Sequence, residues 1–263
     1  MNRIRDCFER LGDRAAFIGY VCAGDPNIET SEAVCAELIE QGVDILELGV
    51  PFSDPLADGL TNQLAAQRAL ESGVTGSQVL ELASRIRKRF PDTPLVFYTY
   101  YNLIYSQGEE SYIQASKESG IDALLTLDMP PEEGEMFLTL CKKHNMENIF
   151  IIAPTTPESR VEKICKVSSG FIYYVSREGV TGERAQLSDR IESQVQMIKK
   201  FTSLPVVVGF GISTEDHVRK VASVADGVVV GSALVNCIAN GTSKKSIVEN
   251  IGQKVSSLIQ GIN

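Results

Sequence analysis

The sequence is poor in the residues that usually mark a metal site or a nucleophilic active site. Its 263 residues include no tryptophan, two histidines, and six cysteines that form neither a CxxC pair nor a Cys/His cluster. Cysteines scattered in this way are typical of a reduced cytosolic protein and indicate no metal site. Both histidines, His144 and His217, lie in polar segments with a helical pattern, so neither is predicted to be catalytic.

Basic charge and long apolar segments are also missing. The net charge of −9 argues against a nucleic-acid partner or an anionic membrane surface, because both require basic surface. No apolar run approaches the roughly 20 residues that span a bilayer, and residues 1–17 lack the apolar core of a signal peptide. We therefore expect a cytoplasmic protein without a membrane or nucleic-acid partner. Backbone amides could still bind a small anion locally.

Short apolar runs alternate with amphipathic helical patterns along the chain. Strands are predicted at residues 16–21, 44–49, 95–100, 123–127, 149–153, 171–175, 205–209 and 227–230. Helices are predicted at about 2–11, 28–41, 62–72, 77–90, 109–119, 133–144, 157–166, 189–201 and 243–259, with a short one between the last two strands. No break in composition indicates a linker, so a single domain over residues 1–263 is expected.

A strict alternation of strands and helices indicates a parallel sheet, and eight units in a chain of about 250 residues fit a closed (β/α)8 TIM barrel. The prediction includes an extra N-terminal helix and a short phosphate-binding helix after the eighth strand. A doubly wound open sheet is the alternative, but its phosphate loop would follow the first strand as GxGxxG. That position reads CAGDPN, residues 22–27, which favours the barrel.

Two carboxylates stand out in the segment ILELGVPFSDPLADGLTNQ, residues 45–63. Glu47 is the only charge in a short apolar run typical of a buried strand, where a bare carboxylate is costly unless it is paired or used. Asp58 follows in a loop rich in Asp, Pro and Gly. The structural alternatives are a Glu47 paired with an Arg or Lys, and an Asp58 that is an ordinary turn residue before Gly59.

The active site of a (β/α)8 barrel lies at the carboxyl ends of its strands, and the unusual residues of this chain collect there. Tyr20 is near the end of the first predicted strand, and Tyr173 lies in the sixth. Glycine-rich loops follow the last three strands, at 180–182, 209–213 and 231–232, where backbone N–H groups could converge on a phosphate. The sequence shows no strand-end Lys for a Schiff base and no nucleophile–His pair. It therefore favours proton transfer on a phosphorylated, sugar-like substrate, such as isomerisation or cleavage.

The segment LELGVPFSDPLADG, residues 46–59, closely resembles the signature of the tryptophan synthase α subunit family. Shorter segments match the same family at comparable positions: GDP at 24–26, YYNLIY at 100–105, LDMP at 127–130, SREGVTG at 176–182, GFGIS at 209–213 and GSA at 231–233. The resemblance thus covers nearly the whole chain. The absence of tryptophan also suits a protein that is needed when tryptophan is scarce.

This resemblance implies a retro-aldol cleavage of indole-3-glycerol phosphate to indole and glyceraldehyde 3-phosphate. It also implies a partner, because in this family indole passes through a tunnel to a β subunit that carries pyridoxal phosphate. An α2β2 heterotetramer is expected, and no cofactor is expected in this chain itself.

The resemblance also implies roles for individual residues. Glu47 would protonate C3 of the indole and accept the proton of the glycerol hydroxyl, because burial in an apolar strand raises the pKa of a glutamate. Ionised Asp58 would bind the indole N–H and stabilise positive charge on that nitrogen. The other predicted positions are Tyr173, Tyr20, Leu125, Phe210, Val229 and Thr181 for the substrate, Gly182, Gly211, Gly231 and Ser232 for the phosphate, and Asp54 and Pro55 for the β subunit.

The chain departs from the family pattern around Asp58. Cys22 stands where the family usually has a threonine whose hydroxyl could hold Asp58, and a thiol is a poorer donor. Leu60 replaces a proline, which gives the loop more freedom, and Asn62 replaces an apolar residue. An active lyase is one hypothesis, and a catalytically impaired subunit that docks on and activates the β subunit is the second. A third is another phosphate-binding barrel, a phosphosugar isomerase or an indole-glycerol-phosphate synthase, but the synthase would need a strand-end Lys.

Overall fold

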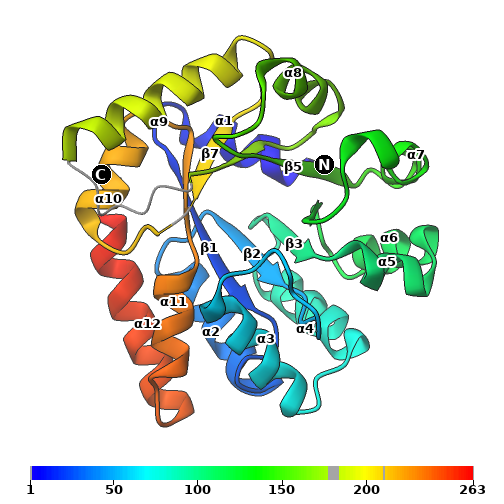
Figure 1. Ribbon diagram of the computed structural model, residues 1–263. Helices are drawn as coiled ribbons and strands as arrows, with labels where there is room; N and C mark the ends of the chain where they lie inside the picture. The colour runs from blue at the N-terminus through cyan, green and yellow to red at the C-terminus, as the bar shows by residue number, and fades with distance from the viewer. Residues whose placement is uncertain (1, 177–183, 210, 263) are drawn as a thin grey trace.

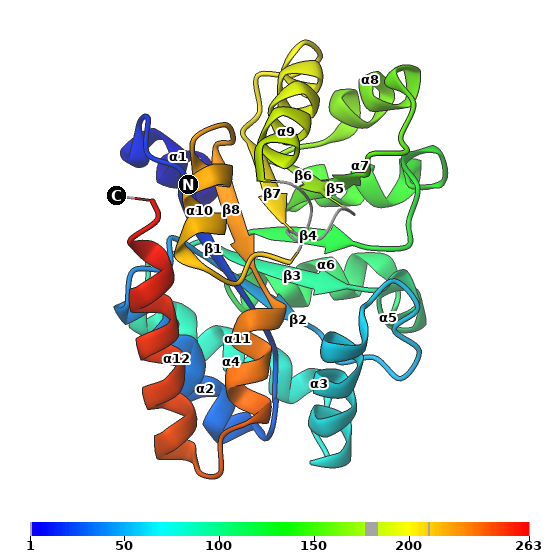
Figure 2. The same ribbon diagram turned by 60° about the vertical axis from the view of Figure 1, so that its left-hand side comes forward.

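Eight parallel strands close into a barrel in the order of the sequence (Figures 1 and 2). The computed structural model describes residues 2–176, 184–209 and 211–262, and the side chains of all of these except 184–190. The strands are β1 (Ala16–Cys22), β2 (Ile45–Gly49), β3 (Leu95–Thr99), β4 (Ala123–Thr126), β5 (Glu147–Ile152), β6 (Ile172–Val175), β7 (Val206–Gly209) and β8 (Gly227–Val230). The barrel closes by pairing of β8 with β1, so the predicted (β/α)8 fold is confirmed.

Helices surround the barrel (Figure 1). They are α1 (Arg3–Leu11), α2 (Ile28–Glu40), α3 (Leu60–Glu71), α4 (Gly76–Arg89), α5 (Tyr101–Gln107), α6 (Glu109–Glu118), the 3-10 turn η1 (Pro131–Glu133), α7 (Glu135–Lys143), α8 (Glu158–Val167), α9 (Arg184–Lys199), α10 (Glu215–Ala222), α11 (Ser232–Ala239) and α12 (Lys244–Ile259). The extra N-terminal helix is α1, and the short helix after the eighth strand is α11.

The structure differs from the prediction mainly at α5 and α9. Helix α5 was not predicted, because its seven residues lack a side-chain N-cap and are too few to show a helical apolar period. Helix α9 begins at Arg184, five residues before the predicted start, within a polar stretch that carries no apolar signal. Strand β5 begins at Glu147 rather than at 149, since a charged first residue obscures the start of a buried strand.

Two apolar layers follow from the alternation of side chains along each strand. Ile18 of β1 points into the barrel, while its neighbour Phe17 packs in the outer layer against the helices. The inner layer is closed at the N-terminal end by Ile4 and Cys7 of α1, both fully buried. The inward residues are Ala16, Ile18, Ile45, Val96, Ala123, Leu125, Ile149, Phe171, Val207 and Val229. Helix α1 therefore plugs one end of the barrel, and the opposite end remains for a site.

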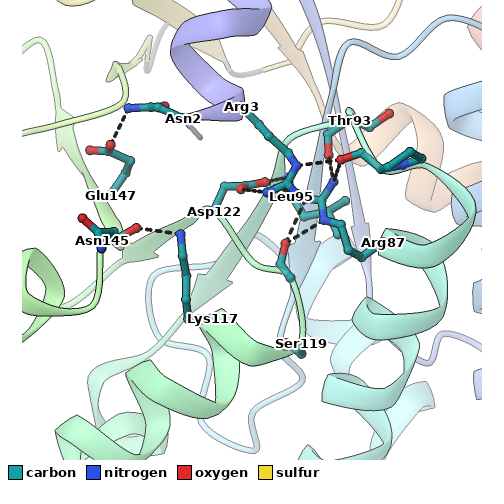
Figure 3. Close-up of polar contacts among 12 residues, drawn as sticks. Asn2, Arg3, Arg87, Thr93, Leu95, Lys117, Ser119, Asp122, Asn145 and Glu147 are labelled. Carbon is teal, nitrogen blue, oxygen red and sulfur yellow. Dashed lines mark hydrogen bonds and ion pairs between the residues drawn. The ribbon is translucent and has the colours of Figure 1, made fainter.

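A polar network ties that plug to the N-terminal face of the barrel (Figure 3). The guanidinium groups of Arg3 and Arg87 converge on the buried carboxylate of Asp122, with N–O distances of 3.0 and 2.6 Å. Asp122 also accepts the backbone N–H of Leu95 at 3.0 Å. Since α1, α4 and the starts of β3 and β4 meet at this carboxylate, the network stabilises the N-terminal face.

Candidate active site

A cavity of about 740 Å³ opens at the carboxyl ends of the strands, opposite α1. This volume is in the range of sites for small organic ligands. It is lined by residues of all eight strands and of loops that follow them, and both carboxylates singled out in the sequence face it. Among the residues that the structure describes, no group of three or more His, Cys, Asp or Glu is arranged to hold a metal ion. Within the same residues, no helix is long and apolar enough to cross a membrane.

Glu47 lies at the middle of β2 with its side chain directed into this cavity, and only 1% of the residue is exposed. Its Oε1 has no hydrogen-bond partner among the described residues. Burial, and secondly the negative charge of Asp58, raise the pKa of Glu47 from 4.5 to about 8. The group is therefore a protonated acid near neutral pH, able to give a proton to a ligand and to take one back.

Asp58 sits in the loop between β2 and α3, and three side chains donate to it. Its Oδ1 accepts the hydroxyl of Tyr98 at 2.8 Å and the amide of Asn62 at 3.3 Å. Its Oδ2 accepts the hydroxyl of Tyr100 at 2.7 Å, and the backbone N–H of Ala57 donates to that same hydroxyl. The loop carboxylate is thus fixed in position by several donors, whereas no described residue donates to Oε1 of Glu47.

The sequence analysis did not select Tyr98 or Tyr100 as site residues. Tyr98 belongs to β3 and lines the cavity, and Tyr100 follows the end of that strand. One signal was available, because Tyr98 is two residues from the inward-facing Val96 and therefore points to the same side of the strand. Its contact with Asp58, forty residues earlier in the chain, could not be derived from the local pattern.

The rings of Tyr20 and Tyr173 pack over the last residue of the next strand, which is a glycine in both cases: Gly49 of β2 and Gly209 of β7. A Cβ atom on Gly49 would lie 2.5 Å from the Tyr20 hydroxyl, and a Cβ on Gly209 would lie 2.5 Å from that of Tyr173. Burial raises the pKa of both tyrosines well above 10, so both hydroxyls keep their protons. The ring of Tyr20 also packs edge to face with Tyr98, at a centroid distance of 5.0 Å.

The far side of the cavity is suited to an anion. Gly231, Ser232 and Ala233 line it at the start of α11, and Gly211 lines it from the loop after β7. No side chain caps this end of α11, which leaves N–H groups of its first turn available to a ligand. A helix N-terminus with unpaired N–H groups attracts phosphate through both its hydrogen bonds and its dipole.

Sequence comparison identifies the family of this barrel. The model of the family described as "Tryptophan synthase alpha chain" matches residues 9–263. The chain belongs to this family. A tryptophan synthase α chain from Opitutus terrae is 55% identical over 264 residues, which cover 99% of each protein. One from Methanocaldococcus jannaschii is 42% identical over 238 residues, covering 90% of this chain and 84% of that protein.

Solved structures of the same family have the same fold. The tryptophan synthase α subunit of Legionella pneumophila superposes with a TM-score of 0.92 at 34% identity, covering 100% of this chain and 98% of that one. A tryptophan synthase structure from M. tuberculosis, in an aminoacrylate-bound form, gives a TM-score of 0.89 at 30% identity with both chains fully covered. A protein of Aquifex aeolicus gives 0.90 at 40% identity, also with full coverage of both chains.

Most of the site residues expected from the family resemblance lie together around the cavity. Besides Glu47 and Asp58, the residues that line it include Tyr20, Tyr173, Val229, Gly211, Gly231 and Ser232. Leu125 does not line it: the side chain is fully buried in the inner layer, where Tyr98 and Tyr173 pack against the same cluster. Thr181, Gly182 and Phe210 lie outside the described residues. Asp54 is exposed and Pro55 half-buried in the loop that leads to Asp58.

Cys22, one of the departures from the family pattern, gives no support to Asp58. Its thiol is buried, that burial strongly raises the pKa of the thiol, and the thiol donates to the carbonyl oxygen of Ala23 at 4.0 Å rather than to Asp58. Asn62, the second departure, donates to Asp58 instead of packing as an apolar residue. The loop carboxylate is thus held by a different set of donors from the one that the family pattern implies.

Proposed function

We propose that this chain cleaves indole-3-glycerol phosphate to indole and glyceraldehyde 3-phosphate, with Glu47 and Asp58 as its catalytic residues. The observation that supports this best is the buried carboxyl of Glu47, whose Oε1 has no hydrogen-bond partner among the described residues and whose pKa of about 8 makes it a proton donor at neutral pH. It faces the same cavity as a second carboxylate that is held by hydrogen bonds. Two carboxyl groups in such different environments serve different roles.

Glu47 moves the proton that the cleavage requires. Its carboxylic acid donates a proton to C3 of the indole, which turns the ring into an electron sink. The resulting carboxylate then takes the proton of the hydroxyl on the adjacent glycerol carbon. As the aldehyde forms, the bond from that carbon to C3 breaks and its electron pair returns to the ring, releasing indole with Glu47 protonated again.

Asp58 stabilises the charge that this protonation creates. Positive charge develops on the indole nitrogen, and a carboxylate that accepts the indole N–H lowers the energy of that state. Tyr173, Tyr20 and Val229 surround the ring. The substrate phosphate binds at the start of α11 and at Gly211, with Gly182 and Ser232 as further ligands. Thr181 and Phe210 complete the substrate contacts, and Leu125 supports them by packing in the cluster against which Tyr173 lies.

We also propose a β subunit as partner, in a cytoplasmic α2β2 complex whose pyridoxal phosphate belongs to that subunit. The surface next to the cavity supports this, because it exposes apolar side chains that a monomer would normally bury. Leu56 is 92% exposed and follows Asp54 and Pro55 directly, and Tyr105 and Met136 are each about two-thirds exposed. We place the docking face on this loop, so that partner binding and catalysis share one segment.

The test is indole release from indole-3-glycerol phosphate by the purified chain, with and without its cognate β subunit. We expect release that rises with the β subunit, falls by at least about 10³-fold in Glu47→Gln, and falls strongly in Asp58→Asn. If no indole forms but the β reaction with free indole and serine accelerates, the chain is an impaired activator. If neither occurs, the proposed function is wrong. The three donors on Asp58 favour the active lyase.

A further inference from the structure

We infer that Tyr98 is a positioning residue that ties Asp58 to the barrel wall and orients its Oδ2 toward the indole N–H. This inference rests on the proposed function, and it goes beyond it by giving a role to a side chain that neither the sequence pattern nor the proposed chemistry uses. Tyr98 belongs to β3, while Asp58 belongs to a loop. Their 2.8 Å hydrogen bond therefore links the loop that carries Asp58 to a strand of the barrel wall.

The ring of Tyr98 is itself fixed on several sides. It packs edge to face on Tyr20 at 5.0 Å, at an interplanar angle of 64°, and it contacts the inner apolar layer of the barrel. Its strand is paired with β2 on one side and β4 on the other. A donor with so little freedom loses little entropy when it forms a hydrogen bond. The Tyr98 hydroxyl therefore sets the direction of the carboxylate more firmly than the amide of Asn62 does, which lies four residues after Asp58 and donates at 3.3 Å.

The two oxygens of Asp58 are left unequal by this arrangement. Oδ1 accepts from both Tyr98 and Asn62, which fills its two lone pairs. Among the described residues, Oδ2 accepts only the Tyr100 hydroxyl, so one of its lone pairs remains for a ligand N–H. Tyr98 thereby selects which oxygen meets the substrate. The buried thiol of Cys22 forms no bond that could replace it.

The test compares two phosphorylated probes that differ in one ring atom. 3-(Indol-3-yl)propyl phosphate can donate its N–H to Asp58, whereas 3-(benzofuran-3-yl)propyl phosphate has the same shape and no N–H. In Tyr98→Phe the ring and its packing remain and only the hydroxyl is lost. We expect the indole probe to bind about fivefold to tenfold more weakly to this variant, and the benzofuran probe to change by less than about twofold.

Two further variants test whether the effect of Tyr98→Phe on the indole probe arises from its bond to Asp58. Tyr112→Phe removes another buried hydroxyl, which lies 3.4 Å from the Thr99 hydroxyl and away from the cavity, and should change neither affinity. In an Asp58→Asn background, Tyr98→Phe should cause no further loss for the indole probe, because the group that it acts through is gone.

Other outcomes would overturn the inference. Equal weakening of both probes would show that Tyr98 acts through ring packing, and an unchanged indole affinity would show that Asp58 does not depend on it. Failure of the unaltered protein to bind either probe or to release indole would refute the proposed function itself. The two failures are therefore distinguishable.

Discussion

At the scale of single residues, the site sets two carboxyl groups in opposite environments. Glu47 is buried, and its Oε1 finds no hydrogen-bond partner in the part of the chain that the structure describes, so desolvation dominates and the pKa of Glu47 rises to about 8. Asp58 is held by two tyrosine hydroxyls and an amide, which stabilise a negative charge. A proton carrier and a charge stabiliser are the two groups that a retro-aldol cleavage of an indole requires.

Because its pKa is raised, Glu47 should make the stability of the protein depend on pH. The unfolded chain releases this proton near pH 4.5, and the folded chain keeps it to about pH 8. The free energy of unfolding therefore falls as the pH rises through that window, by up to about 5 kcal/mol from this group. Glu47→Gln lacks this pH-dependent loss. The free energy of unfolding of the variant, relative to that of the original protein, should therefore rise steadily between pH 5 and pH 8.

Urea unfolding at pH 5, 6, 7 and 8 measures this difference. Glu81→Gln, on the exposed face of α4, serves as a control. Its free energy of unfolding should differ little from that of the original protein at every pH. A stability difference between Glu47→Gln and the original protein that does not change with pH would contradict the assignment of a raised pKa.

At the scale of elements, the ends of two strands are shaped by the tyrosines next to them. Strand β7 ends in Gly209, and Tyr173 of β6 occupies the space where a side chain would project. Strand β2 ends in Gly49 under Tyr20 in the same way. These glycines therefore define the shape of the cavity floor.

Gly209→Ala tests this packing. The added Cβ would lie 2.5 Å from the Tyr173 hydroxyl, and the ring must move to admit it, at a cost of about 1–3 kcal/mol in the free energy of unfolding. Affinity for 3-(indol-3-yl)propyl phosphate should fall as well. Gly76→Ala is the control, because its Cβ would meet only one atom, at 4.0 Å. Equal effects of the two substitutions would refute the argument.

The N-terminal face gives a second prediction at this scale. Arg87 donates to Asp122 and to carbonyl oxygens of Gly120, Phe90 and Thr93, with only 12% of its side chain exposed. Arg87→Ala removes these bonds and weakens the pairing of a buried carboxylate. The free energy of unfolding should fall by about 3 kcal/mol.

Arg85→Ala on the same helix is the matched control for Arg87→Ala. Arg85 is 40% exposed and pairs with partly exposed Glu32 and Glu81, so its loss should cost less than about 1 kcal/mol. Denaturant unfolding of both variants at one pH gives the comparison. Similar losses would mean that the network at Asp122 contributes no more than surface ion pairs do.

At the scale of the whole molecule, the two ends of the barrel have different tasks. One end is closed by α1 and its ion pairs (Figure 3), while the other carries the cavity and the exposed apolar side chains beside it. The contacts that stabilise the barrel thus lie at one end and the candidate site at the other, as is usual in this fold. The loop from Val50 to Gly59 belongs to the second end, where it joins Asp58, the proposed charge stabiliser, to the proposed docking face.

Substitution of the most exposed apolar residue tests that docking face. Leu56→Lys replaces a side chain that is 92% exposed and should weaken binding to the β subunit by tenfold or more, because a charge would be buried at the centre of the interface. Titration of the β-subunit reaction with the variant measures the effect. Val167→Lys, at the N-terminal face, should bind normally, and a matching loss there would place the interface elsewhere.

The sequence by itself determined the elements and two candidate carboxylates, since both depend on local pattern. Eight apolar runs separated by amphipathic periods are enough to predict a (β/α)8 barrel, because side-chain periodicity is a property of each segment. Glu47 was identifiable because it interrupts such a run. Asp58 stood out in a loop rich in Asp, Pro and Gly, and the family resemblance added the roles expected for both carboxylates. The single domain over residues 1–263 stays a prediction.

Only the tertiary structure decided which of these residues contact one another. Tyr98 and Tyr100 lie 40 and 42 residues after Asp58 in the chain. They meet it because β2 and β3 pair as neighbours in the barrel, which brings the β2–α3 loop against the end of β3. Leu125 turned out to pack in the inner layer rather than line the cavity. Contacts between distant segments depend on strand register and on the paths of loops, which no local pattern encodes. The partners that hold Asp58 could therefore be found only in the folded chain.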